Sequence, residues 1–125
     1  MKAKILIVDD EAELRGVVKD LLGMEGYETA EAGDAASLRR QLDGAPADLV
    51  LLDLKLPDGD GLALLPEIKQ KWPNSKVIIL TGYGTVDVAE GAFKTDDQIF
   101  LQSKPFDAGI LKALVELALT RKGSS

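Results

Sequence analysis

The residues best suited to chemistry in this chain are carboxylates that follow runs of apolar residues. Asp9 and Asp10 come directly after the apolar run 5–8, and Asp53 follows 49–52 within LVLLDLKLPDGDGL. Such runs are typical of strands buried on both faces of a sheet. A carboxylate at the end of a buried strand has lost part of its hydration, which is costly without a compensating partner. The pattern therefore predicts a ligand or a chemical role for these acids.

Two further polar residues stand at the ends of candidate strands. Thr81 follows the apolar run 77–80, and Lys104 comes shortly after the weaker run 99–102. A lysine presents a positive charge to a phosphoryl oxygen, and a hydroxyl can donate a hydrogen bond to another. Alone, Thr81 is typical of a strand end, Lys104 of a surface charge, and each aspartate of a helix cap or a turn. Together with the acids they favour a site for a divalent cation and a phosphoryl group.

Composition restricts the available chemistry. The 125 residues contain no cysteine and no histidine, which excludes thiolate nucleophiles, imidazole bases and metal sites built from these ligands. A hard cation such as Mg²⁺ takes oxygen ligands. Phosphoryl transfer depends mainly on positioning and charge neutralisation, and a carboxylate can be its nucleophile. Asp53 is accordingly the candidate phosphoacceptor, with Mg²⁺ as the expected cofactor.

Charge and hydropathy exclude some partners. A net charge of −6 without a basic stripe is a poor basis for direct nucleic-acid binding. No apolar run approaches the ~20 residues of a membrane span. The residues after 5–8 turn acidic at once, which is not the pattern of a secretory signal peptide. We expect a cytoplasmic protein without membrane contact.

Five candidate strands alternate with five helical segments. The strands are 5–8, 27–30, 49–52, 77–80 and 99–102. The helical segments are 14–22, ended by Gly23 and Gly26; 34–42, capped by Asp34; 62–72, ended by Pro73; 85–94, capped by Thr85; and a last one capped by Asp107, with a face of Ile110, Leu111, Leu114, Val115 and Ala118. Pro66 fits the third helix only in or near its first turn.

This alternation predicts an α/β fold with a doubly wound parallel sheet. In such sheets ligands bind beyond the carboxyl ends of the strands, where the acids, Thr81 and Lys104 would meet. The length suits one domain. We expect it to span 1–121, followed by a disordered tail at 122–125.

Four segments together resemble the receiver domain of two-component response regulators. They are ILIVDDE (5–11), DLVLLDLKLPDGDGL (48–62), VIILTGYG (77–84) and KPF (104–106), in the family's order and across essentially the whole chain. The resemblance implies a flavodoxin-like, five-stranded parallel sheet of order 2-1-3-4-5. It also implies a phosphorylation-controlled signalling domain that catalyses only its own phosphorylation and dephosphorylation.

The resemblance implies roles for individual residues of the acidic site. Asp53 would be the phosphoacceptor, supplied by a histidine kinase or a phosphotransfer protein. Asp9, Asp10, Asp53 and the main-chain carbonyl of Lys55 would hold Mg²⁺. The response would pass to a second copy or an output domain through the surface of the fourth helix, fifth strand and fifth helix.

The switch segment follows the family only in part. Thr81 matches the switch hydroxyl, Lys104 the phosphate-binding lysine, and Pro105 the position of a cis peptide. Family members have a Gly-Ala pair after the fourth helix and an aromatic residue three positions before the lysine. Here KTDDQIFLQSKPF lacks the pair, and Phe100 stands four positions before Lys104. The switch position falls to Phe100 if a bulge restores the register, and otherwise to Leu101.

Three other functions fit parts of the pattern. A Mg²⁺-dependent phosphohydrolase with an Asp nucleophile would have an acid where this chain has Lys55, and a cap domain. A flavodoxin-like mononucleotide binder needs a loop rich in Gly, Ser or Thr after its first strand, where this chain has DDEAE. A receiver-like module that binds partners without phosphorylation stays open because of the unusual segment before Lys104.

Overall fold

A five-stranded parallel sheet forms the centre of the molecule, with strands in the order β2-β1-β3-β6-β7. The computed structural model describes residues 3–81, 99–103 and 107–120. The strands are β1 (Lys4–Val8), β2 (Glu28–Ala32), β3 (Leu49–Asp53), β6 (Lys76–Thr81) and β7 (Ile99–Ser103). Counted within this sheet, the order is the predicted 2-1-3-4-5. A two-residue pair that the sequence did not predict, β4 (Lys55–Leu56) and β5 (Gly59–Asp60), forms a separate antiparallel hairpin after β3.

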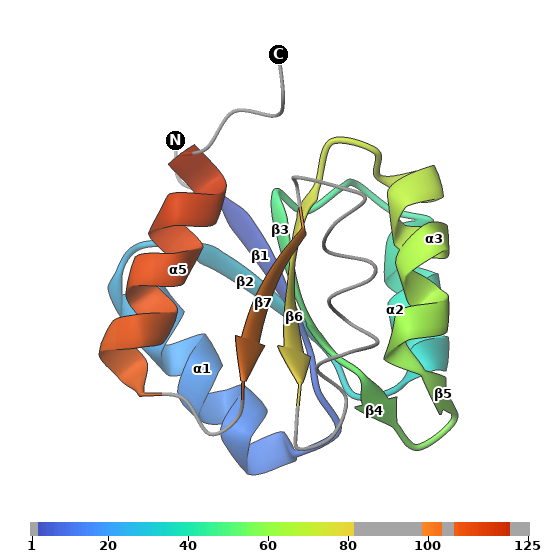
Figure 1. Cartoon of the computed structure of the whole chain (residues 1–125), viewed down its shortest axis with the longest axis horizontal. Helices are drawn as coiled ribbons and strands as arrows, with labels where there is room; N and C mark the ends of the chain where they lie inside the picture. Colours follow the sequence, from blue (N-terminus) through green and yellow to red (C-terminus); the bar gives the residue numbers. More distant parts are fainter. Residues whose placement is uncertain (1–2, 82–98, 104–106, 121–125) are drawn as a thin grey trace.

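Helices cover both faces of the sheet, as a doubly wound fold requires (Figure 1). One face carries α1 (Ala12–Met24) and α5 (Ala108–Thr120), and the other carries α2 (Ala35–Leu42) and α3 (Gly61–Lys71). The predicted helix at 85–94 lies outside the described residues. None of the helices in the described part combines the length and apolar character of a membrane span.

The alternation of side chains along the strands divides the apolar residues into two cores. In β1, Leu6 and Val8 pack toward α2 and α3, whereas Ile5 and Ile7 pack toward α1 and α5. All five residues of β3 are buried, because both of its faces are covered. This explains why the sequence shows β1 and β3 as unbroken apolar runs.

Helix ends follow the local sequence. Asp34 accepts a hydrogen bond from the Ser37 N–H at 2.7 Å, and Asp107 accepts one from the Ile110 N–H at 2.7 Å, which confirms both predicted N-caps. At the end of α1, Gly26 has a φ of 91°, and the Tyr27 N–H bonds to the Leu22 carbonyl. This is a Schellman motif, in which glycine avoids the strain of a left-handed conformation.

Several expectations about the elements were wrong in detail. Gly23 lies inside α1, so only Gly26 ends that helix. Pro66 is the sixth residue of α3, beyond the first turn; burial of its neighbours outweighs the hydrogen bond that the proline removes. Ile110 is 50% exposed, although it shares the predicted spacing of the apolar face of α5. The strand predicted at 27–30 begins at Glu28 and continues to Ala32, because its pairing with β1 sets its ends.

Candidate functional site

Three carboxylates meet at the carboxyl ends of two neighbouring strands. β1 pairs with β3 in a register that places Val8 beside Leu52, so the residues that follow lie side by side. Asp9, Asp10 and Asp53 each offer a carboxylate oxygen, and these oxygens lie within 4.8 Å of one another. Asp9 and Asp53 are buried, and Asp10 is exposed. The structure thus brings together the three acids that the sequence selected, in a cluster open to solvent at Asp10.

Asp9 is fixed by the turn between β1 and α1. Its Oδ1 accepts a hydrogen bond from the Glu11 N–H at 2.9 Å, and its own N–H donates to the Ala32 carbonyl at 3.1 Å. The guanidinium of Arg15 donates to the Asp9 carbonyl. Asp9 therefore has a structural role in this turn in addition to its place in the acidic cluster.

Asp53 is held by the hairpin that follows it. The Lys55 N–H donates to the Asp53 Oδ1 at 3.1 Å, so the first residue of β4 positions the carboxylate. The Lys55 side chain points to solvent, since the residue is exposed. The Gly61 N–H, at the start of α3, donates to the Leu54 carbonyl at 2.8 Å. The first residue of the β4–β5 hairpin and the residue that follows it are thus both hydrogen-bonded to the chain around Asp53.

Gly61 is needed for close backbone packing. A Cβ atom at this position would lie 2.3 Å from the Asp53 carbonyl oxygen and 2.7 Å from the Leu54 Cα. Both distances are far below van der Waals contact, and both atoms belong to the backbone. Only glycine lets α3 begin directly against the strand that carries Asp53. The sequence signals this residue only as one glycine of the DGDG turn.

The cluster has the composition of a site for a hard cation. Its ligands are all carboxylate oxygens, the donor type that Mg²⁺ and Ca²⁺ take. Three carboxylates this close repel one another, and a divalent cation relieves the repulsion. The few carboxylates and the exposed Asp10 leave room for water and phosphate oxygens, which is the arrangement that Mg²⁺ favours. The residues therefore fit the metal that the sequence led us to expect.

A second charged cluster lies beside the first and was not anticipated from the sequence. The Arg15 Nε donates to Glu31 at 3.0 Å, and the Lys19 Nζ lies 3.3 Å from the other Glu31 carboxylate oxygen. Burial raises the pKa of Glu31, but the hydrogen bonds from Arg15 and Lys19 outweigh it and hold that pKa below its ordinary value. The i, i+4 spacing of Arg15 and Lys19 was the available signal that they share a helix face.

For Thr81, Phe100 and Leu101 the structure gives the strand pairing of the backbone. Thr81 is the last residue of β6 and pairs with Ser103. Phe100 pairs with Ile78 and Leu101 with Ile79, in a register that continues without a bulge over 99–103. The assignment of the switch position to Phe100 or Leu101 stays a prediction. Lys104 and Pro105 lie outside the described residues.

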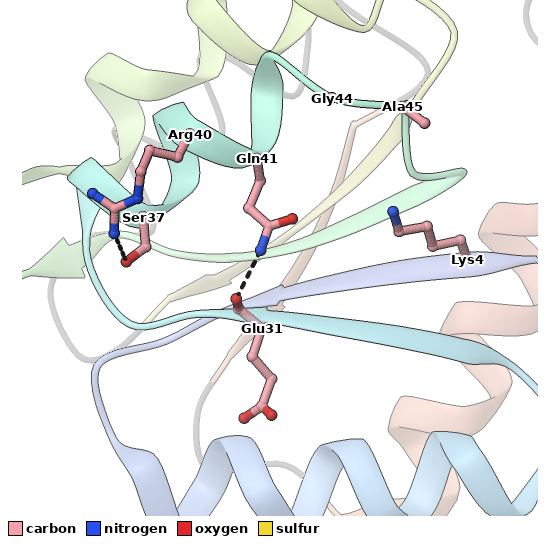
Figure 2. A pocket seen from close by; sticks show the side chains of 7 residues that line it. All are labelled: Lys4, Glu31, Ser37, Arg40, Gln41, Gly44 and Ala45. Carbon is pink, nitrogen blue, oxygen red and sulfur yellow. Dashed lines mark hydrogen bonds between the residues drawn. The ribbon is translucent and has the colours of Figure 1, made fainter.

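A hollow on the β2 side of the molecule is a separate feature (Figure 2). It is lined by Lys4, Glu31, Ser37, Arg40, Gln41, Gly44 and Ala45. The Gln41 side chain donates to the Glu31 main-chain oxygen at 3.2 Å, and the Glu31 carboxylate points away, toward α1. None of the clustered acids lines this hollow. We therefore assign the chemistry to the edge formed by β1 and β3.

The sequence also matches a known protein family. The family model described as the response regulator receiver domain matches residues 5–116. The chain therefore belongs to the receiver domains of two-component response regulators. These are phosphorylation-controlled signalling domains that interact with histidine kinases or phosphotransfer proteins.

Individual relatives show the same relationship. The chain is 41% identical to the response regulator protein PilR of Pseudomonas aeruginosa over 94% of its own length and 26% of that protein. It is 34% identical to sporulation initiation phosphotransferase F of Bacillus subtilis, covering 99% of both chains. The crystal structure of the receiver domain of NtrX from Brucella abortus superposes with a TM-score of 0.82 at 40% identity, over 94% of this chain and 99% of that one.

The relatives differ in how much of them the chain spans. It covers about a quarter of the length of PilR and of the NtrC and NtrX proteins that it matches. It covers nearly all of sporulation initiation phosphotransferase F. The similarity between this chain and the longer relatives therefore extends over their receiver domains alone.

Proposed function

We propose that this domain accepts a phosphoryl group on Asp53 in a Mg²⁺-dependent reaction, with a histidine kinase or a phosphotransfer protein as donor. The observation that carries the proposal is the cluster of Asp9, Asp10 and Asp53, whose carboxylate oxygens lie within 4.8 Å of one another at the carboxyl edge of the sheet. A ligand site at this edge is the general rule for open α/β sheets. The chain has no cysteine or histidine that could serve as an alternative nucleophile.

Asp9, Asp10, Asp53 and the Lys55 carbonyl would hold the cation. Bound Mg²⁺ would neutralise negative charge on the oxygens of the transferred phosphoryl group. A carboxylate oxygen of Asp53 attacks phosphorus while the bond between phosphorus and the donor's nitrogen breaks. Hydrogen bonding of the Lys55 N–H to the Asp53 Oδ1 orients the nucleophile. Thr81 and Lys104 would then bind the phosphoryl oxygens, through a hydroxyl and a positive charge.

The output is a change of a partner-binding surface. New contacts of Thr81 and Lys104 to the phosphoryl group would favour one state of the surface formed by the fourth helix, β7 and α5. A second copy or an output domain would bind to this surface. The protein would act in the cytoplasm, and the receiver domain itself would not bind nucleic acid. The domain would catalyse only its own phosphorylation and dephosphorylation.

Labelling with a small phosphodonor tests the proposal. Acetyl phosphate with Mg²⁺ should add one phosphoryl group to Asp53, detected by mass spectrometry of the intact chain and of its peptides. EDTA should prevent the addition. The Asp53→Asn variant keeps the shape of the side chain but removes the nucleophilic carboxylate, so it should stay unlabelled. Equal labelling of Asp53→Asn, or full labelling in EDTA, would contradict the assignment.

A further inference from the structure

Asp58 makes a contact that its place in a turn does not explain. Its Oδ1 accepts a hydrogen bond from the Ala35 N–H at 2.7 Å, and its Oδ2 accepts one from the Ala36 N–H at 3.1 Å. Both donors belong to the first turn of α2, whose N–H groups have no partner within the helix. One carboxylate from the β4–β5 hairpin thus binds the N-terminus of a helix 23 residues earlier in the chain.

The contact joins the hairpin to a fixed part of the fold. Leu38 and Ala35 of α2 are both buried. A Cβ atom on Gly59 would lie 3.4 Å from the Ala35 Cβ, so the turn also packs on this part of α2. Within the hairpin, Lys55 pairs with Asp60 and Leu56 with Gly59. Because the β4–β5 pairing is short, fixing Asp58 in place also restricts the position of Lys55.

Lys55 connects this restraint to the acidic cluster. Its N–H donates to the Asp53 Oδ1, so a displaced hairpin would weaken this hydrogen bond and change the orientation of the carboxylate. We propose that Asp58 is a positioning residue for the cation site: it binds the α2 N-terminus and thereby fixes the main chain of Lys55 against Asp53. This inference rests on the proposed function for the Mg²⁺ site but concerns a residue that the phosphoryl transfer itself does not use.

The same helix provides a matched control. Asp34 caps α2 from its own N-cap position, where its side chain accepts the Ser37 N–H, and it is not part of the β4–β5 hairpin. Replacing Asp34 or Asp58 with alanine removes one carboxylate from the same helix N-terminus, so both variants should lose stability. Only Asp58→Ala should also weaken the hydrogen bond from the Lys55 N–H that orients the Asp53 carboxylate. Asp58→Asn keeps an acceptor oxygen but removes the charge, which separates positioning from electrostatic attraction of the cation.

The experiment measures two quantities on the full chain. Calorimetric titration with MgCl₂ should show affinity reduced about 10-fold in Asp58→Ala, the lower end of the range for residues that orient metal ligands. Asp34→Ala should retain the wild-type affinity, and Asp58→Asn should recover most of it. Without metal, the Lys55 amide should exchange hydrogen faster in Asp58→Ala than in wild type or Asp34→Ala.

The outcomes separate the two proposals. Equal Mg²⁺ affinity and equal Lys55 exchange in Asp58→Ala and Asp34→Ala would overturn the positioning role. An Asp58→Asn variant as weak as Asp58→Ala in affinity, with wild-type exchange at Lys55, would show that only charge matters and would also overturn it. A wild-type chain that binds no Mg²⁺ would instead refute the metal site, and the exchange rates would still decide whether Asp58 holds the hairpin.

Discussion

Two charged clusters lie at the same end of the sheet, and they are built on opposite principles. The edge of β1 and β3 gathers three carboxylates within 4.8 Å of one another. The cluster beside it places one carboxylate, Glu31, between two cations, Arg15 and Lys19. Opposite charges in contact stabilise the fold by themselves, whereas clustered like charges cost stability until a cation arrives. The candidate site therefore gathers like charges, whereas the neighbouring cluster pairs opposite charges.

The largest effect should separate the clusters by their response to Mg²⁺. Asp10→Ala removes one of few anionic ligands, so we expect its Mg²⁺ affinity to fall about 100-fold or more, above the effect of residues that only orient ligands. Glu31→Ala should bind Mg²⁺ as wild type does, because its carboxylate faces α1. Calorimetry on both variants makes the comparison, and unchanged affinity in Asp10→Ala would remove Asp10 from the site.

The next effect concerns how tightly the backbone is packed around each cluster. Gly61→Ala places a Cβ 2.3 Å from the Asp53 carbonyl oxygen, while Gly33→Ala places one 3.1 Å from the tip of the flexible Arg15 side chain. We expect Gly61→Ala to destabilise the fold by about 2 kcal/mol or more, since backbone must move, and Gly33→Ala to cost much less. Urea unfolding monitored through buried Trp72, the chain's only tryptophan, measures both. Similar costs would show that the backbone near Asp53 yields easily.

A smaller effect should have opposite signs in the two clusters. Without metal, Asp10→Asn removes a like charge and should raise the free energy of unfolding slightly, by a few tenths of a kcal/mol. Glu31→Gln removes the partner of two cations and should lower it by about 0.5 kcal/mol, as expected for a partly exposed ion pair. Denaturant unfolding in EDTA measures both. Destabilisation by Asp10→Asn would mean that its carboxylate is already compensated within the chain.

The smallest effect is the pH dependence of the balanced cluster. The pKa of Glu31 lies below its ordinary value of 4.5 in the fold, so its stabilising contribution is complete above pH 4.5 and is lost as pH falls through the lowered value. The stability difference between wild type and Glu31→Gln should therefore shrink on acidification from neutral pH. A difference that stays constant below the folded pKa would show that Glu31 contributes through packing alone.

The sequence allowed the acidic site to be predicted because its residues are marked by local signals. Asp9, Asp10 and Asp53 each follow an unbroken apolar run, and parallel strands bring such ends together at one edge. The alternation of strands and helices and the helix caps at Asp34 and Asp107 could be read in the same way, whereas the strand order was implied by the resemblance to receiver domains. These features depend on residues within a few positions of one another, so the physical reason for them is local.

Only the tertiary structure decided which other residues support the site. Arg15 meets Glu31 and the Asp9 carbonyl, Gly61 meets the Asp53 backbone, and Asp58 meets the start of α2. Each contact joins segments whose approach is set by sheet register and helix packing. The sequence does not say which groups an aspartate in a turn will bind; Asp58 accepts hydrogen bonds from Ala35 and Ala36 because α2 begins beside the hairpin. The sequence by itself therefore determined the fold class and the three acids, while long-range packing decided how those acids are held.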